Sequence, residues 1–211
     1  MTSKHVIVIV ACGILLAAGC GSAPPPAPGS ATPATTASET QHVIAGPVAL
    51  DAPASWHVRS GTPNPSGDVT LAFLGPGELP DNCQASGQGG VCLPWPVIQL
   101  VPGGMVVAVR GHGMPGSEPP AGGDPIMVGG LSARRISGSA DEACRAIGGS
   151  ELIAIVVPEV AGTTGWMGID ACLAGGDVAA AKAAFTAIAD SVTMVADAAL
   201  PLGQTSLDES T

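Results

Sequence analysis

Cysteine is the residue type in this chain with the clearest chemical potential. Four of the six cysteines lie beyond the first twenty residues, an even number that predicts disulfide bonds if the chain is exported. We favour the pairs Cys83–Cys92 and Cys144–Cys172. In the chain-entropy model each pair stabilises the fold by about 2.5–3.5 kcal/mol. The cysteines lack the close ligand spacing of zinc motifs, so no metal site is predicted.

The histidines and serines form no pattern that predicts catalysis. No two histidines stand at metal-binding spacing, and neither a Gly-x-Ser-x-Gly motif nor a phosphate-binding glycine motif occurs. A Ser/His/Asp triad assembled from distant residues would leave no local pattern. We therefore predict no catalytic, cofactor-binding or metal-binding residues and no enzyme activity.

Two further features combine charge or length in a way that suits binding. Residues 111–124 are rich in Gly and Pro and predict a long loop, which we interpret as mobile rather than functional. Arg134 and Arg135 are adjacent, so on a strand they point to opposite faces. We expect a structural ion pair with a carboxylate, the alternative being an anion site.

The first nineteen residues have the features of a secretory signal. A start with one Lys precedes residues 6–18, an uninterrupted run of apolar and small residues. This run is shorter than the roughly 20 residues that a membrane-spanning helix needs. Its end, Ala17-Ala18, and the following Gly19 are small residues, as expected before the cleavage site of a signal peptide. We expect residues 1–19 to be removed on export.

The end of this segment, Leu16-Ala17-Ala18-Gly19-Cys20, resembles the lipobox of bacterial lipoproteins. The resemblance implies cleavage after Gly19, a thioether-linked diacylglyceryl group on Cys20 and usually N-acylation of the new terminus. Two or three acyl chains are enough for stable attachment, because each buried methylene contributes about 0.8 kcal/mol. A lipid-anchored protein on the extracytoplasmic face of the cell membrane is therefore implied.

Composition divides the remaining chain into a tether, a domain and a tail. Residues 20–41 are dominated by Ser, Ala, Pro, Thr and Gly, and such a stretch buries too little apolar surface to fold. Residues 42–195 are predicted to form a single exported domain, and residues 196–211 a flexible acidic tail. Without residues 1–19 the chain has 6 basic and 17 acidic side chains, a net charge of −11. This charge excludes nucleic acid as a partner.

Short apolar segments bounded by Gly, Pro, Asn or Asp predict the β-strands of the domain. The predicted strands are residues 43–50, 56–59, 69–74, 97–101, 105–110, 131–136, 152–157 and 166–173. We expect segments 97–101 and 105–110 to form a hairpin. We also expect 152–157 and 166–173 to pair as antiparallel neighbours. Trp56, Trp95 and Trp166 are expected in the core.

One amphipathic helix is predicted near the C-terminus. Asp177 is the expected N-cap, because its carboxylate can accept from the free N–H groups of a first turn. Apolar residues then follow at steps of three and four, at Val178, Ala181, Phe185, Ile188 and Val192. A weaker helical turn is expected over residues 140–147. This order predicts an α+β fold, an antiparallel sheet or sandwich with the C-terminal helix packed on it. An all-β immunoglobulin-like sandwich is the alternative.

The two edges of the domain resemble a known family. Ala52-Pro53-Ala54-Ser55-Trp56 is similar to the Pro-x-x-Trp opening of Mog1/PsbP-like domains, and residues 166–172 and 177–192 are similar to their last strand and closing helix. In bacterial lipoproteins that family supplies non-enzymatic binding or accessory modules, and the resemblance implies such a role here.

Three classes of function follow from these features. The first is a non-catalytic binding or adaptor module at the cell envelope, anchored through lipidated Cys20, with an envelope protein as its partner. The second is a carrier of a lipid or other apolar ligand, which a pocket of several hundred Å³ would favour. The third and most distant is an extracytoplasmic hydrolase, which would require Ser, His and Asp side chains to converge.

Overall fold

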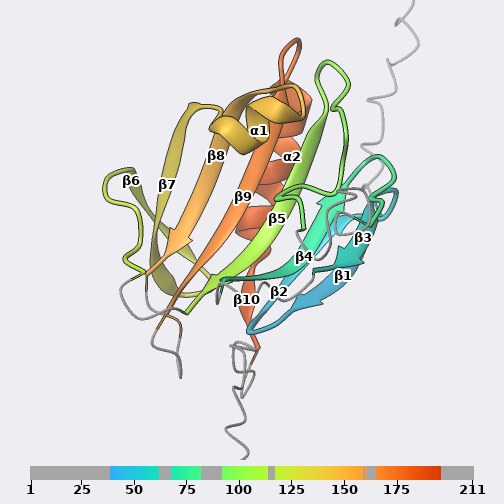
Figure 1. Cartoon of the computed structure of the whole chain (residues 1–211). Helices are drawn as coiled ribbons and strands as arrows, with labels where there is room; N and C mark the ends of the chain where they lie inside the picture. Colours follow the sequence, from blue (N-terminus) through green and yellow to red (C-terminus); the bar gives the residue numbers. More distant parts are fainter. Residues whose placement is uncertain are drawn as a thin grey trace, which may run out of the picture. The chain divides into compact units, whose positions relative to one another are not determined.

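The computed structural model describes residues 39–61, 68–81, 92–113, 117–158, 160 and 165–195. These residues form two antiparallel β-sheets and two helices (Figure 1), an architecture consistent with the predicted sheet sandwich. The smaller sheet has the order β1-β2-β10, with β1 Thr40–Ala45, β2 Val48–Pro53 and β10 Thr193–Met194. The larger sheet has the order β3-β4-β5-β9-β8-β7-β6. Its strands are β3 His57–Ser60, β4 Asp68–Gly75, β5 Met105–His112, β6 Asp124–Val128, β7 Leu131–Ser139, β8 Gly149–Val157 and β9 Trp166–Ala174.

The segment predicted as one strand over residues 43–50 is a hairpin instead. Ala45 of β1 pairs with Val48 of β2 across the two-residue turn Gly46-Pro47. Gly46 has a φ of 58°, a left-handed conformation that glycine adopts at little cost. The prediction was wrong because apolar residues on both sides of the turn were taken as one continuous run, although Gly-Pro is itself a turn signal.

Strands β5, β9 and β8 form the buried centre of the larger sheet. The predicted pairing of residues 152–157 with 166–173 is confirmed by β8 and β9, in which Ile155 lies opposite Ile169. The other edge of β9 pairs with β5, where Val109 lies opposite Ile169. Successive side chains of a strand point to opposite faces of the sheet. Each of these strands therefore contributes to two different environments.

Apolar side chains fill one face of the larger sheet, which we call the first face. Val107, Val109 and Ile169 belong to a buried cluster that also contains Leu50 of the smaller sheet and Phe185 of helix α2 (Ala179–Asp190). Phe185 and Leu50 have no exposed surface. Fully burying a side chain of this size contributes about 1.5–3 kcal/mol, so this cluster is the main source of stability in the described residues.

The opposite face, the second face, is apolar only in part. Phe73, Ala108 and Cys172 form a smaller buried cluster there with Trp95 and with Cys144 of helix α1 (Glu142–Ala146). Figure 1 shows α1 and α2 on opposite sides of the larger sheet. The buried cluster of the first face thus includes a residue of α2, the longer helix, and that of the second face includes a residue of α1, the shorter one.

An aspartate carboxylate accepts a backbone hydrogen bond at the start of each helix. The predicted helical turn over residues 140–147 is confirmed as α1, and the Asp141 carboxylate accepts from the Cys144 N–H at 2.7 Å. Helix α2 begins one residue later than predicted, because Val178 rather than Asp177 occupies the N-cap position. The Asp177 carboxylate still accepts from the Ala179 N–H, at 3.1 Å. Its capping chemistry was therefore anticipated, but its exact position was not.

The predicted hairpin of residues 97–101 with 105–110 is wrong in its first half. Residues 105–110 lie in β5, whereas residues 97–101 form neither a helix nor a strand. Their Val-Ile-Gln-Leu-Val composition favours a strand, but β5 is already paired on both edges, by β4 and β9. No edge of β5 is left for them.

Several remaining predictions concern the ends of the chain and its loops. Residues 1–19, most of the predicted tether 20–41 and the tail 196–211 lie outside the described residues, although β1 begins at Thr40. Residues 117–123, the described middle of the predicted loop, contain no helix or strand. Strands β6 and β10 were not predicted. Trp95 and Trp166 are buried as expected, and Trp56 is partly buried against the first-face cluster.

Candidate functional site

An apolar groove opens where β4 leaves the larger sheet and β5 enters it. Its volume is about 420 Å³, and residues 75–80 and 97–101 line its two sides, with Gly104 and Met105 between them. A volume of this size falls within the range of small-molecule and peptide-binding clefts. We call this cleft the edge groove.

Residues 97–101 are held in place by contacts with the second face. Leu100 is 8% exposed and belongs to the second-face cluster, and its N–H donates to the carbonyl of Ile147 at 2.8 Å. The segment then turns back into β5 through Gly103, whose φ is 75°. The Gly104 N–H closes this turn by donating to the Val101 carbonyl at 2.8 Å. The wall formed by residues 97–101 is therefore fixed at Leu100, which is buried, and at Val101, where the turn into β5 begins.

The surface of the edge groove is apolar and unusually exposed. Ile98 is 78% exposed and Val101 is 71% exposed. Of the described lining residues, only Glu78 carries a charge, and it too is exposed. Exposed apolar surface that is continuous with a cleft is a feature of many interaction sites.

A polar cluster occupies the second face where its apolar cluster ends. The Arg110 side chain of β5 lies over the Trp95 ring, with Cζ 4.7 Å from the ring centroid. Arg110 Nη2 donates to the Pro94 carbonyl at 3.0 Å, and Nε lies 3.6 Å from Asp170 Oδ2 on β9. Trp95 Nε1 and Arg110 Nε have no hydrogen-bond partner among the described residues. The cluster thus anchors the loop that carries Trp95 to the sheet.

The titration of the Asp170 carboxyl clearly departs from its ordinary behaviour. Burial raises the pKa of its carboxyl above 3.8, because desolvation disfavours the charged form. The positive charges of Arg110 and His112 act in the opposite direction, and the Asp141 carboxylate adds to the increase. Desolvation therefore outweighs the ion pair with Arg110.

The second face continues with an aromatic stack. The His112 and Trp166 rings are stacked 3.7 Å apart with an interplanar angle of 10°. Trp166 Nε1 donates to the Ser117 hydroxyl at 3.3 Å. The stack thus extends the second face from His112 of β5 to Trp166 of β9.

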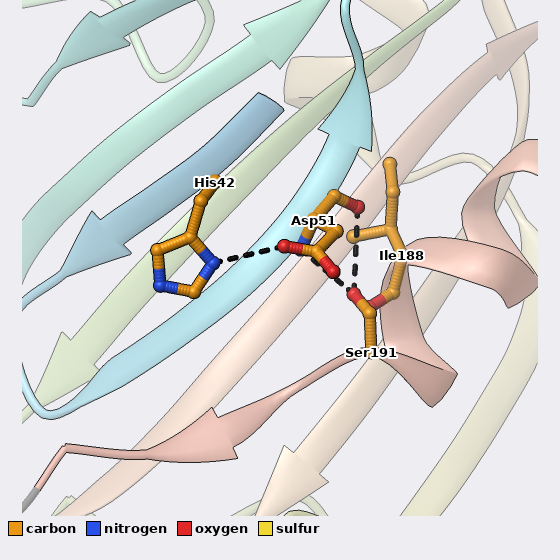
Figure 2. A network of polar contacts seen from close by, with 4 residues as sticks. All are labelled: His42, Asp51, Ile188 and Ser191. Carbon is orange, nitrogen blue, oxygen red and sulfur yellow. Dashed lines mark hydrogen bonds and ion pairs between the residues drawn. The ribbon is translucent and has the colours of Figure 1, made fainter. Parts of the chain in front are cut away.

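A histidine, an aspartate and a serine do approach one another beside the smaller sheet (Figure 2). His42 Nδ1 lies 2.9 Å from Asp51 Oδ1, with both side chains about half exposed to solvent. The Ser191 hydroxyl accepts from the backbone N–H of Asp51 at 2.8 Å and donates to the Ile188 carbonyl at 2.7 Å. Asp51 thus stands between the histidine and the serine.

This arrangement differs from a nucleophilic triad in its order of contacts. In a triad the histidine lies between the serine, which it deprotonates, and the carboxylate, which orients it. In Figure 2 the Ser191 hydroxyl instead contacts only backbone atoms of Asp51 and Ile188. The network ties the end of α2 to β2, and it supplies no base to the hydroxyl.

The structure brings together one of the two predicted disulfide pairs. Cys144 and Cys172 are bonded, with their Cα atoms 5.6 Å apart, which joins α1 to β9 and confirms that pair. Cys92 is also disulfide-bonded, whereas Cys83 lies outside the described residues. Cys20, the predicted lipidation site, lies outside them as well.

The predicted ion pair of Arg134 or Arg135 is wrong for the described part of the chain. Arg135 Nη1 donates to the Thr186 hydroxyl at 3.4 Å, and its guanidinium lies 6.0 Å from the Phe185 ring. Neither arginine forms an ion pair with a described carboxylate. The groups that contact Arg135 are thus a hydroxyl and an aromatic ring of α2 rather than an acid.

The described residues contain no group of three or more His, Cys, Asp or Glu side chains placed to hold a metal ion. None of their helices is long and apolar enough to cross a membrane. No protein-family model matches the chain, and no curated protein matches it significantly. The lipobox and Mog1/PsbP-like resemblances therefore stay predictions.

The sequence did not reveal the edge groove or the polar cluster. Arg110 and Asp170 lie 60 residues apart on separate strands, so no local motif joins them. The polar cluster could have been predicted from the single charge inside each of two otherwise apolar strands. A charge buried in a sheet needs a partner nearby, so the two residues were candidates for a pair. For the edge groove, the signal was a strand-like segment bounded by Pro96 and Pro102.

Proposed function

We propose that this chain is a non-catalytic binding or adaptor module, held on the extracytoplasmic face of the cell membrane by lipid on Cys20. The observation that carries the proposal is the edge groove, with Ile98 78% and Val101 71% exposed on one wall. Exposing such side chains to water is unfavourable, and covering them by a partner recovers that free energy.

Other described contacts suggest that the rest of the domain is a rigid framework that carries the edge groove. The second face is fastened by the Cys144–Cys172 disulfide and by the ion pair of Arg110 with Asp170. We infer that α2 packs across the first face, and the membership of Phe185 in the first-face cluster supports this. A rigid framework that carries an exposed loop is the usual arrangement of binding proteins.

The proposal is tested by crosslinking in the intact envelope. The full chain is produced in a bacterial host with a photoreactive amino acid in place of Ile98, or in place of Met127 on β6 as a control. Met127 is 66% exposed and lies outside the edge groove. We expect one discrete adduct from position 98 and none of that mass from position 127. Equal adducts from both positions, or none, would count against the edge groove as the binding site.

The membrane anchor is tested separately by Cys20→Ser. The resemblance to a lipobox predicts that the wild-type chain sediments with membranes and that the variant does not, because the thioether linkage requires the Cys20 thiol. A variant that stays with the membrane fraction to the same extent contradicts lipid anchoring through Cys20.

A carrier of a lipid or another apolar ligand is the second candidate. The volume of about 420 Å³ favours it, since a pocket of this size can enclose much of a small apolar molecule. Native mass spectrometry of the full chain in detergent distinguishes the two. A mass excess that disappears on denaturation and is identified as a lipid, in addition to the lipid on Cys20, supports the carrier. Its absence favours a protein partner.

The hydrolase alternative receives no support from the described residues. Where His42, Asp51 and Ser191 gather, the Ser191 hydroxyl is committed to the end of α2. We therefore propose no catalytic role for His42, Asp51 or Ser191.

A further inference from the structure

One wall of the edge groove is an unpaired segment with the composition of a β-strand. Residues 97–101 read Val-Ile-Gln-Leu-Val, and they pair with no strand in the part of the chain that the structure describes. Residues of these types favour strands because they pack well on a pleated, half-buried surface. The segment therefore has strand-forming side chains beside an open cleft and no neighbouring strand.

The main chain of this segment is open to a partner. The N–H of Leu100 and the carbonyl of Val101 are bonded within the protein, to Ile147 and Gly104. The N–H groups of Ile98 and Gln99 have no partner among the residues described. An extended peptide offers main-chain donors and acceptors in series, whereas an acyl chain offers neither. The exposed backbone thus favours a peptide over a lipid.

The negative charge of Glu78 and of the whole chain favours a peptide that contains a basic residue. Glu78, exposed on the opposite wall, forms no ion pair with any described residue, and the whole chain has a net charge of −10. A basic residue in the occupant is attracted by both, because complementary charge steers association and fixes register. A second copy of this chain brings the same negative charge and is repelled. Charge complementarity therefore points to a different, basic partner.

We propose that the edge groove binds an extended segment of a partner polypeptide, apolar along its length and with Lys or Arg at one end, that adds as a strand beside residues 97–101. This inference rests on the proposed binding function and names the chemistry of the partner. Ile98 and Val101 contact the apolar side chains, and Glu78 receives the basic residue.

The test is selection from a random peptide library displayed on phage, with the full chain in detergent micelles as the target. Ile98→Asp is the groove variant, and Ile44→Asp on β1, where Ile44 is 67% exposed, is the matched control. We expect enriched peptides to combine alternating apolar residues with Lys or Arg at one end. Their affinity should fall by about tenfold or more for Ile98→Asp and stay unchanged for Ile44→Asp.

Two modifications of an enriched peptide test its mode of binding. N-methylation at alternate residues removes main-chain donors along one edge and should weaken binding by about tenfold. Glu78→Gln should weaken it by a smaller factor, about threefold, and should reduce its dependence on salt. Undiminished binding of the N-methylated peptide would overturn strand addition.

Other outcomes also decide against the inference. An acidic consensus among the enriched peptides, or no peptide that depends on Ile98, overturns it. A dimer in sedimentation experiments that Ile98→Asp dissociates makes a second copy the occupant and overturns it too. Crosslinking from position 98 is an independent measurement. Positive crosslinks with a failed peptide selection therefore reject the strand-adding peptide but leave the proposed binding function standing.

Discussion

The two faces of the larger sheet are built by the same strands and differ in almost every respect. On β5, Val107 and Val109 point to the first face, and Ala108 and Arg110 to the second. The first face holds a single apolar cluster shared with the smaller sheet and α2. The second holds a small apolar cluster, a disulfide and a half-buried ion pair. Stability is therefore concentrated on one face, which leaves the other free to carry specific contacts.

The largest effect expected is the loss of a first-face side chain. Phe185→Ala removes a ring with no exposed surface, and truncation of a buried Phe costs about 3–5 kcal/mol of unfolding free energy. Denaturant unfolding followed by circular dichroism measures it. Ile98→Ala, at a site 78% exposed, is the control and should change stability by less than about 0.5 kcal/mol. Similar costs for both would contradict the assignment of the main core to the first face.

A smaller loss of stability, with a more specific cause, is expected on substitution of Gly149, which lies at the start of β8 beside the disulfide. A Cβ at this position would lie 2.2 Å from Cys144 Sγ and 2.4 Å from Cys172 Sγ. Gly149→Ala should therefore destabilise the fold by about 1–3 kcal/mol through overpacking. In a Cys144→Ala/Cys172→Ala background the same change should cost less, because both sulfurs are gone and only the backbone carbonyl of residue 144, 2.7 Å from the added Cβ, still crowds it. An equal cost in the two backgrounds would show that the sulfurs are not the cause.

The link between the smaller sheet and α2 should contribute less. Ser191→Ala removes the acceptor of the Asp51 N–H and the donor to the Ile188 carbonyl, at a cost of about 1 kcal/mol. His42→Ala removes the contact between the exposed His42 and Asp51 side chains and should cost between zero and about 1 kcal/mol. Thermal unfolding of both variants ranks them. A larger loss for His42→Ala than for Ser191→Ala would contradict the structural role given to the hydroxyl.

The smallest effect, and the one specific to the second face, is a dependence of stability on pH. Burial raises the pKa of the Asp170 carboxyl, so the folded state binds this proton more tightly than the unfolded chain does. Its contribution is complete below the ordinary pKa of 3.8 and is lost as the pH rises through the raised value. Asp170→Asn removes this titration.

The stability of Asp170→Asn relative to wild type should accordingly increase as the pH rises from about 4 to 7. Denaturant unfolding at several pH values measures the difference. Asp190→Asn, at an exposed position at the end of α2, is the matched control. A difference that stays constant with pH would contradict the buried, raised carboxyl.

The sequence predicted those parts of the fold that depend on local pattern. β8 and β9 were predicted as an antiparallel pair from short apolar runs, and α1 from Asp141 and the residues after it. The Gly46-Pro47 turn was also readable, but the apolar residues around it were given more weight. Such features are set by a few neighbouring residues, so a single sequence contains them.

The candidate site depends on contacts that no local pattern records. Residues 97–101 have strand-forming side chains, but whether they pair depends on β4 and β9 having taken both edges of β5. The approach of Arg110 to Asp170 depends in the same way on the register of two strands. Predicting either would have required the order of strands in the sheet, which periodicity does not give.

The hairpin at the start of the domain has a mechanical consequence. If the domain is anchored at Cys20, as proposed, a pull by its partner enters the described fold next to Thr40, which pairs with Pro53 at the open end of β1 and β2. The load falls first on the bond from Ala54 N–H to the Glu39 carbonyl, and then on the Gln41 amide, which holds the Pro53 and Trp56 carbonyls. Because β1 is an outer strand of its sheet, we expect it to separate from β2 one residue pair at a time. The hairpin would then extend under load before force reaches the larger sheet.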